Sequence, residues 1–98
     1  MSAPRSDSAG IRQTARALSE AGWELDHVWD REEDTPVKPE DQVVAAVTAV
    51  DAAFLYVKRG TETGYVFFVL GNDPEEVICD HTINLSYVLD LLVEGWSE

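Results

Sequence analysis

Carboxylates dominate the residues of this sequence that could take part in chemistry. The chain has 98 residues, with 19 aspartates and glutamates against 7 lysines and arginines, and its formal net charge is −12. After Arg59 it contains eight carboxylates and no lysine or arginine. This net charge exceeds the magnitude of about 2–8 that suits a small soluble domain, and self-repulsion on that scale opposes compaction. We therefore expect a surface that meets a positively charged partner.

The chemistry that these acids support is ion pairing with arginine and lysine side chains. The densest group of expected partner-binding residues is Asp30, Glu32, Glu33, Asp34, Glu40 and Asp41. A second expected patch is Glu75, Glu76 and Asp80. A single charge run is usually a solvated loop, but here the acidic excess continues into the last helix. In the first strand we expect Glu24, Asp26 and Asp30 to form an outward row, with alternate residues roughly 6.5 Å apart.

The residues that most often ligate metals or act as nucleophiles are few and lie in unpromising patterns. His27 and His81 each follow an aspartate, but neighbouring residues of a strand point to opposite faces and cannot easily share an ion. A metal site of His27, Cys79 and His81 would require their two strands to pair. Cys79 lies between apolar and acidic neighbours, which predicts a buried and inert thiol. We expect no metal, no cofactor and no enzymatic activity.

Two elements should precede the acidic group. Residues 1–6 read as a disordered leader, and residues 7–98 as one domain. A helix should run from Asp7 or Ser8 to Ala21, with Gly22 ending it. Residues 23–30 alternate, which predicts a half-buried strand with Trp23, Leu25, His27 and Trp29 on its apolar side.

The remaining elements follow a loop at residues 31–38. A helix should begin at Pro39 and bury Val43, Val47 and Val50 on one face, although the valine-rich composition also allows a strand here. Residues 54–58 and 65–70 predict a hairpin, residues 76–81 a further strand, and a last helix should run from Asn84 or Ser86 to about Gly95. The predicted fold is therefore a small α+β domain. Its antiparallel sheet combines a three-strand meander with one further strand, and two or three helices pack mainly on one face.

The last helix has a broader apolar band than an ordinary surface helix. One explanation is that it lies in the middle of the helical layer and is contacted from both sides. The alternative is a dimer or partner interface formed by Tyr87, Leu91 and Trp96, with Asp90 and Glu94 at its rim.

Composition excludes several classes of protein. A lone cysteine allows no internal disulfide, and with no apolar leader it favours a cytoplasmic location. No segment has the roughly 20 apolar residues that span a bilayer. The strong acidity also opposes direct binding of nucleic acid or of an anionic membrane.

In size, acidity and α+β character the chain resembles the small inhibitors of bacteriophages and mobile elements, including anti-CRISPR proteins and DNA mimics. That resemblance implies an inhibitor of a basic, nucleic-acid-binding host protein. The alternative function is a dimeric structural or regulatory subunit that associates through the last helix, with its acidity serving solubility.

Overall fold

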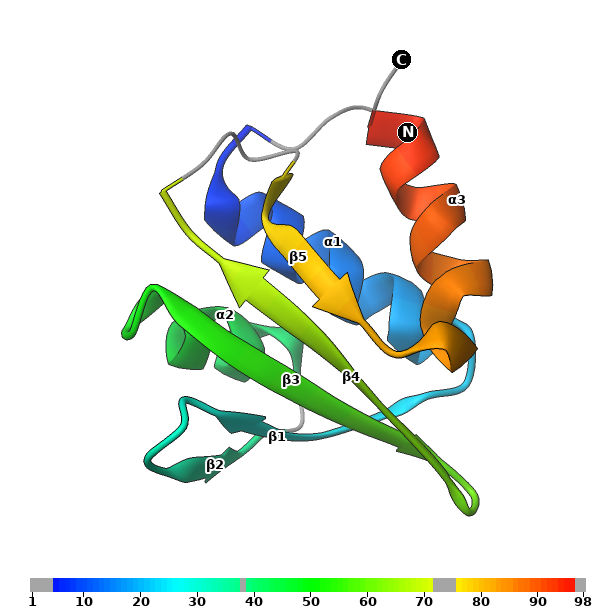
Figure 1. Ribbon diagram of the computed structural model, residues 1–98, viewed down its shortest axis with the longest axis horizontal. Coiled ribbons are helices and arrows are strands. Elements are labelled where there is room, and N and C mark those ends of the chain that lie inside the picture. Colours follow the sequence, from blue (N-terminus) through cyan, green and yellow to red (C-terminus); the bar gives the residue numbers. More distant parts are fainter. Residues whose placement is uncertain (1–4, 38, 72–75, 97–98) are drawn as a thin grey trace.

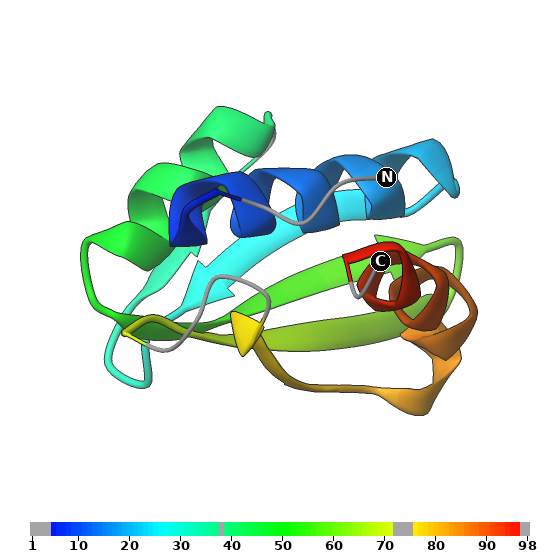
Figure 2. The ribbon, with the colours of Figure 1, turned by 90° about the horizontal axis from the view of Figure 1, so that it is seen from above.

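The protein folds into a five-stranded antiparallel sheet with its helices gathered on one face (Figures 1 and 2). This computed structural model describes residues 5–37, 39–71 and 76–96. Strand order is β2-β1-β3-β4-β5. The elements are α1 (Asp7–Glu20), β1 (Glu24–Trp29), β2 (Asp34–Pro36), α2 (Glu40–Thr48), β3 (Ala52–Arg59), β4 (Glu62–Val69), β5 (Ile78–His81), a 3₁₀ helix η2 (Ile83–Leu85) and α3 (Ser86–Trp96). The predicted α+β class and the β3-β4-β5 meander are confirmed.

Helix α1 forms as the sequence indicates. Ser6 caps it, because its side-chain oxygen accepts a hydrogen bond from the backbone N–H of Ala9 at 3.2 Å. Its stripe of Ile11, Ala15 and Leu18 is fully buried, and Gly22 follows it at a φ of +93°. Of the expected disordered leader at residues 1–6, residues 1–4 lie outside the described residues, and Ser6 belongs instead to the cap of α1.

The core fills the space between the sheet and the helices. Ala53, Leu55 and Val57 of β3 alternate into it, as do Val66 and Phe68 of β4. Helix α2 buries Val43, Val44 and Val47, whereas Val50 lies beyond its end and is 39% exposed. The expectation that Val50 completes the buried face is therefore wrong.

Strand β1 departs from simple alternation. Its pairing with β3 shifts between Leu25 and His27, so that Asp26 occupies a β-bulge. Val28 is consequently buried against the core, and His27 and Trp29 face the other side of the sheet. The expected apolar side of β1 holds for Trp23 and Leu25 and is wrong for His27 and Trp29, because the extra residue reverses the faces beyond it. The expected outward row of Glu24, Asp26 and Asp30 is broken for the same reason.

Strand β2 forms the outer edge next to β1, within residues 31–38, where a loop was predicted. It pairs Pro36 with His27 and Asp34 with Trp29. Gly60 and Thr61 form a two-residue turn between β3 and β4, so the connection is tighter than the gap between the predicted strands at residues 54–58 and 65–70. Gly64 is instead a buried residue of β4.

Candidate binding surface

The face of the sheet opposite the helices is lined with aromatic side chains. No described helix covers it (Figure 2). Six half-buried rings, one of them an imidazole, make up what we call the open face: His27, Trp29, Phe54, Tyr56, Tyr65 and Phe67. Phe54 lies at its centre, with ring centroids 4.4 Å from Phe67, 5.4 Å from Tyr65 and 5.5 Å from Trp29. The surface is thus a continuous aromatic layer.

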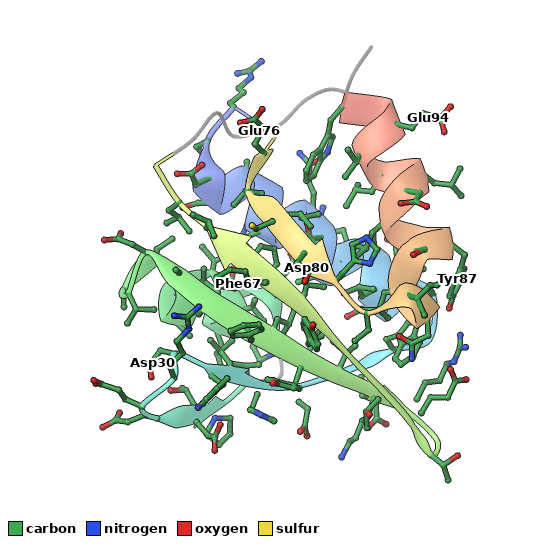
Figure 3. The ribbon with its side chains drawn as sticks, viewed as in Figure 1. Asp30, Phe67, Glu76, Asp80, Tyr87 and Glu94 are labelled. Atoms are coloured by element: carbon green, nitrogen blue, oxygen red, sulfur yellow. The ribbon has the colours of Figure 1, made fainter. Side chains whose placement is uncertain are left out.

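Strand register orders these rings into a row that carries a carboxylate at each end. Asp34 pairs with Trp29, Trp29 with Phe54, Phe54 with Phe67, and Phe67 with Asp80. Five neighbouring strands at about 4.8 Å each place the two aspartates roughly 19 Å apart. Figure 3 shows Phe67 with Asp80 beside it and Asp30 toward the β2 edge. One residue of each predicted acidic patch, Asp34 and Asp80, therefore borders this surface.

The loop from β1 to β2 is held by one of its own acids. Asp30 Oδ1 accepts hydrogen bonds from the backbone N–H groups of Glu32 at 2.9 Å and Glu33 at 2.7 Å. These bonds stabilise the carboxylate and lower the pKa of Asp30, Glu33 contributing most. Asp30 therefore orders the loop. Glu32, Glu33 and Asp34 are exposed, and we call these four residues the acidic hairpin.

Glu40 and Asp41 serve a different purpose from the one predicted. Glu40 lies 2.6 Å from Arg16 Nη2 and 3.5 Å from Arg12 Nη1, and Arg12 also pairs with Asp41. The hydrogen bond from Arg16 is the main reason that the pKa of Glu40 is lowered. These two acids are neutralised by α1, so they join α2 to α1 and add less to the outward potential.

The second predicted patch lies at β5. Glu76 precedes the strand and is exposed, and so is Asp80, whose Oδ1 accepts the backbone N–H of His81 at 2.9 Å. Glu75 lies outside the described residues. The three residues considered for a metal site do not come together. His27 lies on β1, Cys79 and His81 lie on β5, and β3 and β4 separate these two strands.

The predictions for His27 and Cys79 need correction. Cys79 is exposed, because a register shift beside it displaces it from the core alternation. His27 lies on the open face, not on the core side. It stacks on Tyr56 with centroids 4.7 Å apart, and its Nδ1 is 2.8 Å from Asp26 Oδ2. Asp26 in turn has a lowered pKa, owing first to this hydrogen bond and then to nearby Lys58.

The proposed interface on α3 is also changed. Trp96 is 2% exposed and donates its indole N–H to Gln13 Oε1 at 2.8 Å, so it belongs to the core. Tyr87 is half exposed, but its hydroxyl accepts hydrogen bonds from Trp23 Nε1 at 2.9 Å and Arg59 Nη1 at 2.6 Å. Leu91 is 70% exposed and remains available for an interface.

Sequence reasoning missed the open face, although one signal was present. Residues 52–57 and 64–70 are apolar in nearly every position, which is typical of strands buried on both faces. Helices predicted for only one face leave the other set of apolar residues without cover. Phe54, Tyr56, Tyr65 and Phe67 are that set.

Two shallow hollows lie away from this face, one of about 360 Å³ lined by Ser19, Trp23, Glu24 and Leu25. The other, of about 370 Å³, lies between β2 and α2. Ser19 and Glu24 share the first lining, but no hydrogen bond joins their side chains in the described part of the chain. Among the described residues, no helix has the length and apolar character needed to cross a membrane.

Comparison of the chain with protein-family models, with curated proteins and with solved structures found no match. The functional argument therefore rests on the chemistry of the open face and the acidic hairpin.

Proposed function

We propose that the protein is a non-enzymatic binding protein that engages a basic protein partner through its acidic hairpin and the adjoining open face. One contrast carries the proposal. Four cations, Arg12, Arg16, Lys58 and Arg59, each have a carboxylate within 3.5 Å. Glu32, Glu33 and Asp34 are exposed and have no described lysine or arginine within 4 Å. Such unbalanced charge attracts a complementary surface and accelerates association.

The partner that fits this surface best is a nucleic-acid-binding protein, which the chain would inhibit or regulate. Lysines and arginines that contact phosphates form a ready-made cationic surface. Carboxylates at both ends of the aromatic row could engage two separate groups of such residues. This is the behaviour expected of a DNA mimic or anti-CRISPR-like inhibitor, and the net charge of −12 opposes contact with nucleic acid itself.

The test begins with capture of partners from a bacterial lysate at low salt, followed by competition with duplex DNA. The Glu32→Lys, Glu33→Lys, Asp34→Lys triple variant should then associate with the captured protein at least tenfold more slowly, because electrostatic steering is reversed. The matched control reverses Glu20, Asp90 and Glu94, which are exposed and outside the hairpin. Equal association rates for the two triple variants would assign the effect to net charge alone and contradict the hairpin as the binding site.

A second candidate function is association through α3. Tyr87 and Leu91 share a face of the helix, and Ile83, four residues before Tyr87, is 88% exposed. A dimeric regulatory subunit would bury these side chains. Sedimentation equilibrium separates the two functions: a monomer at all concentrations contradicts the dimer, whereas a dimer that Leu91→Glu dissociates supports it.

A further inference from the structure

The open face already holds an arginine side chain in the protein's own structure. The guanidinium carbon of Arg31 lies 5.7 Å from the ring centroid of Phe67 and 6.0 Å from that of Phe54. These distances fall within the range of cation–π attraction. No described carboxylate lies within 4 Å of the Arg31 guanidinium. The aromatic rings, not an ion pair, are what its charged group meets.

The backbone at Arg31 has a conformation that L-residues rarely adopt. Its φ is +81°, a value that non-glycine residues avoid. The residue nevertheless stays exposed, in a loop that Asp30 closes. A long cationic side chain is thus held at the rim of the aromatic row without being buried.

Elsewhere in the molecule, Arg59 contacts both an aromatic ring and a carboxylate. Its guanidinium carbon lies 4.6 Å from the Trp23 ring centroid, and its Nη2 pairs with Glu62 at 3.2 Å. It also donates a hydrogen bond to Tyr87. Rings beneath the guanidinium and a carboxylate at its edge therefore accommodate arginine in this fold. The open face offers the same two elements, with its carboxylates at the ends of the row.

We propose that the open face binds arginine side chains of the protein partner, and that Arg31 occupies one of these positions until the partner displaces it. The inference rests on the proposed function and adds the chemistry of recognition. Arginine fits better than lysine because its planar, weakly hydrated guanidinium stacks on aromatic faces. A polyanion is disfavoured by the carboxylates around the rings, and a second copy of this chain would bring the same negative charge.

Three probes test the proposal: an oligo-arginine peptide, an oligo-lysine peptide of equal length and a single-stranded DNA oligonucleotide. Binding is measured by fluorescence anisotropy at low salt. The unaltered protein should bind the arginine peptide roughly tenfold more tightly than the lysine peptide, as expected from cation–π contacts with two rings. The oligonucleotide should bind more weakly than either peptide.

Two sets of variants locate the preference. Phe54→Thr with Phe67→Thr removes the rings but keeps residues suited to strands. The ratio of the affinity for the arginine peptide to that for the lysine peptide should therefore fall to nearly one. Its control, Ile83→Thr, alters an exposed apolar side chain outside the open face and should keep the preference. Arg31→Asn vacates the internal position, and asparagine tolerates a positive φ. It should bind the arginine peptide several-fold more tightly than Arg5→Asn, which removes the same charge from another exposed site.

Each outcome discriminates. Binding of neither peptide by the unaltered protein contradicts the proposed function and this inference together. Tightest binding of the oligonucleotide likewise contradicts both. Equal binding of the two peptides contradicts the inference alone. So does an identical effect of Arg31→Asn and Arg5→Asn. Because Arg31 lies in a loop, that comparison remains decisive even if the double phenylalanine variant does not fold, which circular dichroism would reveal.

Discussion

At the scale of single residues, Gly64 determines how closely the chain after β5 approaches the sheet. A Cβ at this position would lie 2.8 Å from Thr82 Oγ1 and 3.1 Å from both Asn84 Oδ1 and Leu85 Cγ. Contacts below 3.0 Å force atoms to move, and Thr82 is fixed by hydrogen bonds to Tyr65 and Asn84. The absence of a side chain therefore positions η2, and with it the start of α3.

This crowding gives a stability prediction. Gly64→Ala should lower the free energy of unfolding by about 1–3 kcal/mol, the usual effect of overpacking a well-packed site. Denaturation with urea measures the change. Thr63→Ala is the control: it lies next in the strand but is exposed, so it should change stability by less than about 0.5 kcal/mol. If both variants lowered the free energy of unfolding equally, strand propensity and not crowding would explain the effect.

Hydrogen bonds between distant residues explain why the interface predicted on α3 was partly wrong. From the helical pattern alone, Trp96 and Tyr87 are equally good candidates for interface residues. Gln13, 83 positions away, accepts the indole N–H of Trp96, and Trp23 donates to the Tyr87 hydroxyl. Pairings of this range are fixed by tertiary packing, which no local pattern records.

At the scale of elements, helices and the central hairpin were predictable, because their apolar spacing is local. The faces of β1 were not. Its sequence alternates without interruption, yet the bulge at Asp26 places Val28 in the core and His27 on the open face. Pairing with β3 decides this: it must bury Val28 opposite Leu55 and Leu25 opposite Val57. The same pairing places His27 and Trp29 on the open face. From the sequence alone, that face could be predicted only as a set of apolar residues of β3 and β4 that no helix covers.

The ion pairs that join α2 to α1 give a pH prediction. The pKa of Glu40 is lowered from its ordinary value of 4.5, chiefly by the hydrogen bond from Arg16. A lowered folded-state pKa contributes stability that is present above pH 4.5 and is lost as pH falls through the folded-state pKa. Glu40→Gln should therefore be less stable than the unaltered protein by about 0.5–1 kcal/mol at neutral pH.

That difference should shrink in acid, when Glu40 of the unaltered protein becomes protonated. Urea denaturation of both proteins across the range measures it. Glu94→Gln, a substitution at an exposed acid outside this cluster, should show a smaller difference at every pH. A Glu40→Gln difference that stays constant into acid would show that packing, and not the ion pairs, is responsible.

At the scale of the whole molecule, charge is distributed unequally. Arg12 and Arg16 lie on α1 and pair with α2, while Lys58 and Arg59 end β3 and pair with carboxylates beside them. Among the described residues, the acidic hairpin and Asp80 have no lysine or arginine within 4 Å, although His27 Nε2 lies 3.6 Å from Asp34 Oδ1. Other exposed acids, such as Asp90 and Glu94 on α3, also have no ion pair among the described residues. The acidic hairpin is the uncompensated group that adjoins the open face, where we propose that the partner binds.

This distribution predicts opposite effects of salt on folding and on binding. The screening length falls to about 10 Å at 0.1 M salt. Sodium chloride should raise the midpoint of thermal unfolding, because screening the repulsion of a net charge of −12 outweighs weakening a few exposed ion pairs. Association with the basic partner should slow over the same range.

The Glu32→Lys, Glu33→Lys, Asp34→Lys variant supplies the comparison, since three reversals change the net charge by +6, from −12 to −6. Its unfolding midpoint should rise less with salt than that of the unaltered protein, and its association should lose most of its salt dependence. Calorimetry and stopped-flow association measure the two quantities. An unfolding midpoint that falls with sodium chloride in the unaltered protein would mean that its ion pairs outweigh its self-repulsion, and the acidity would then need no partner to explain it.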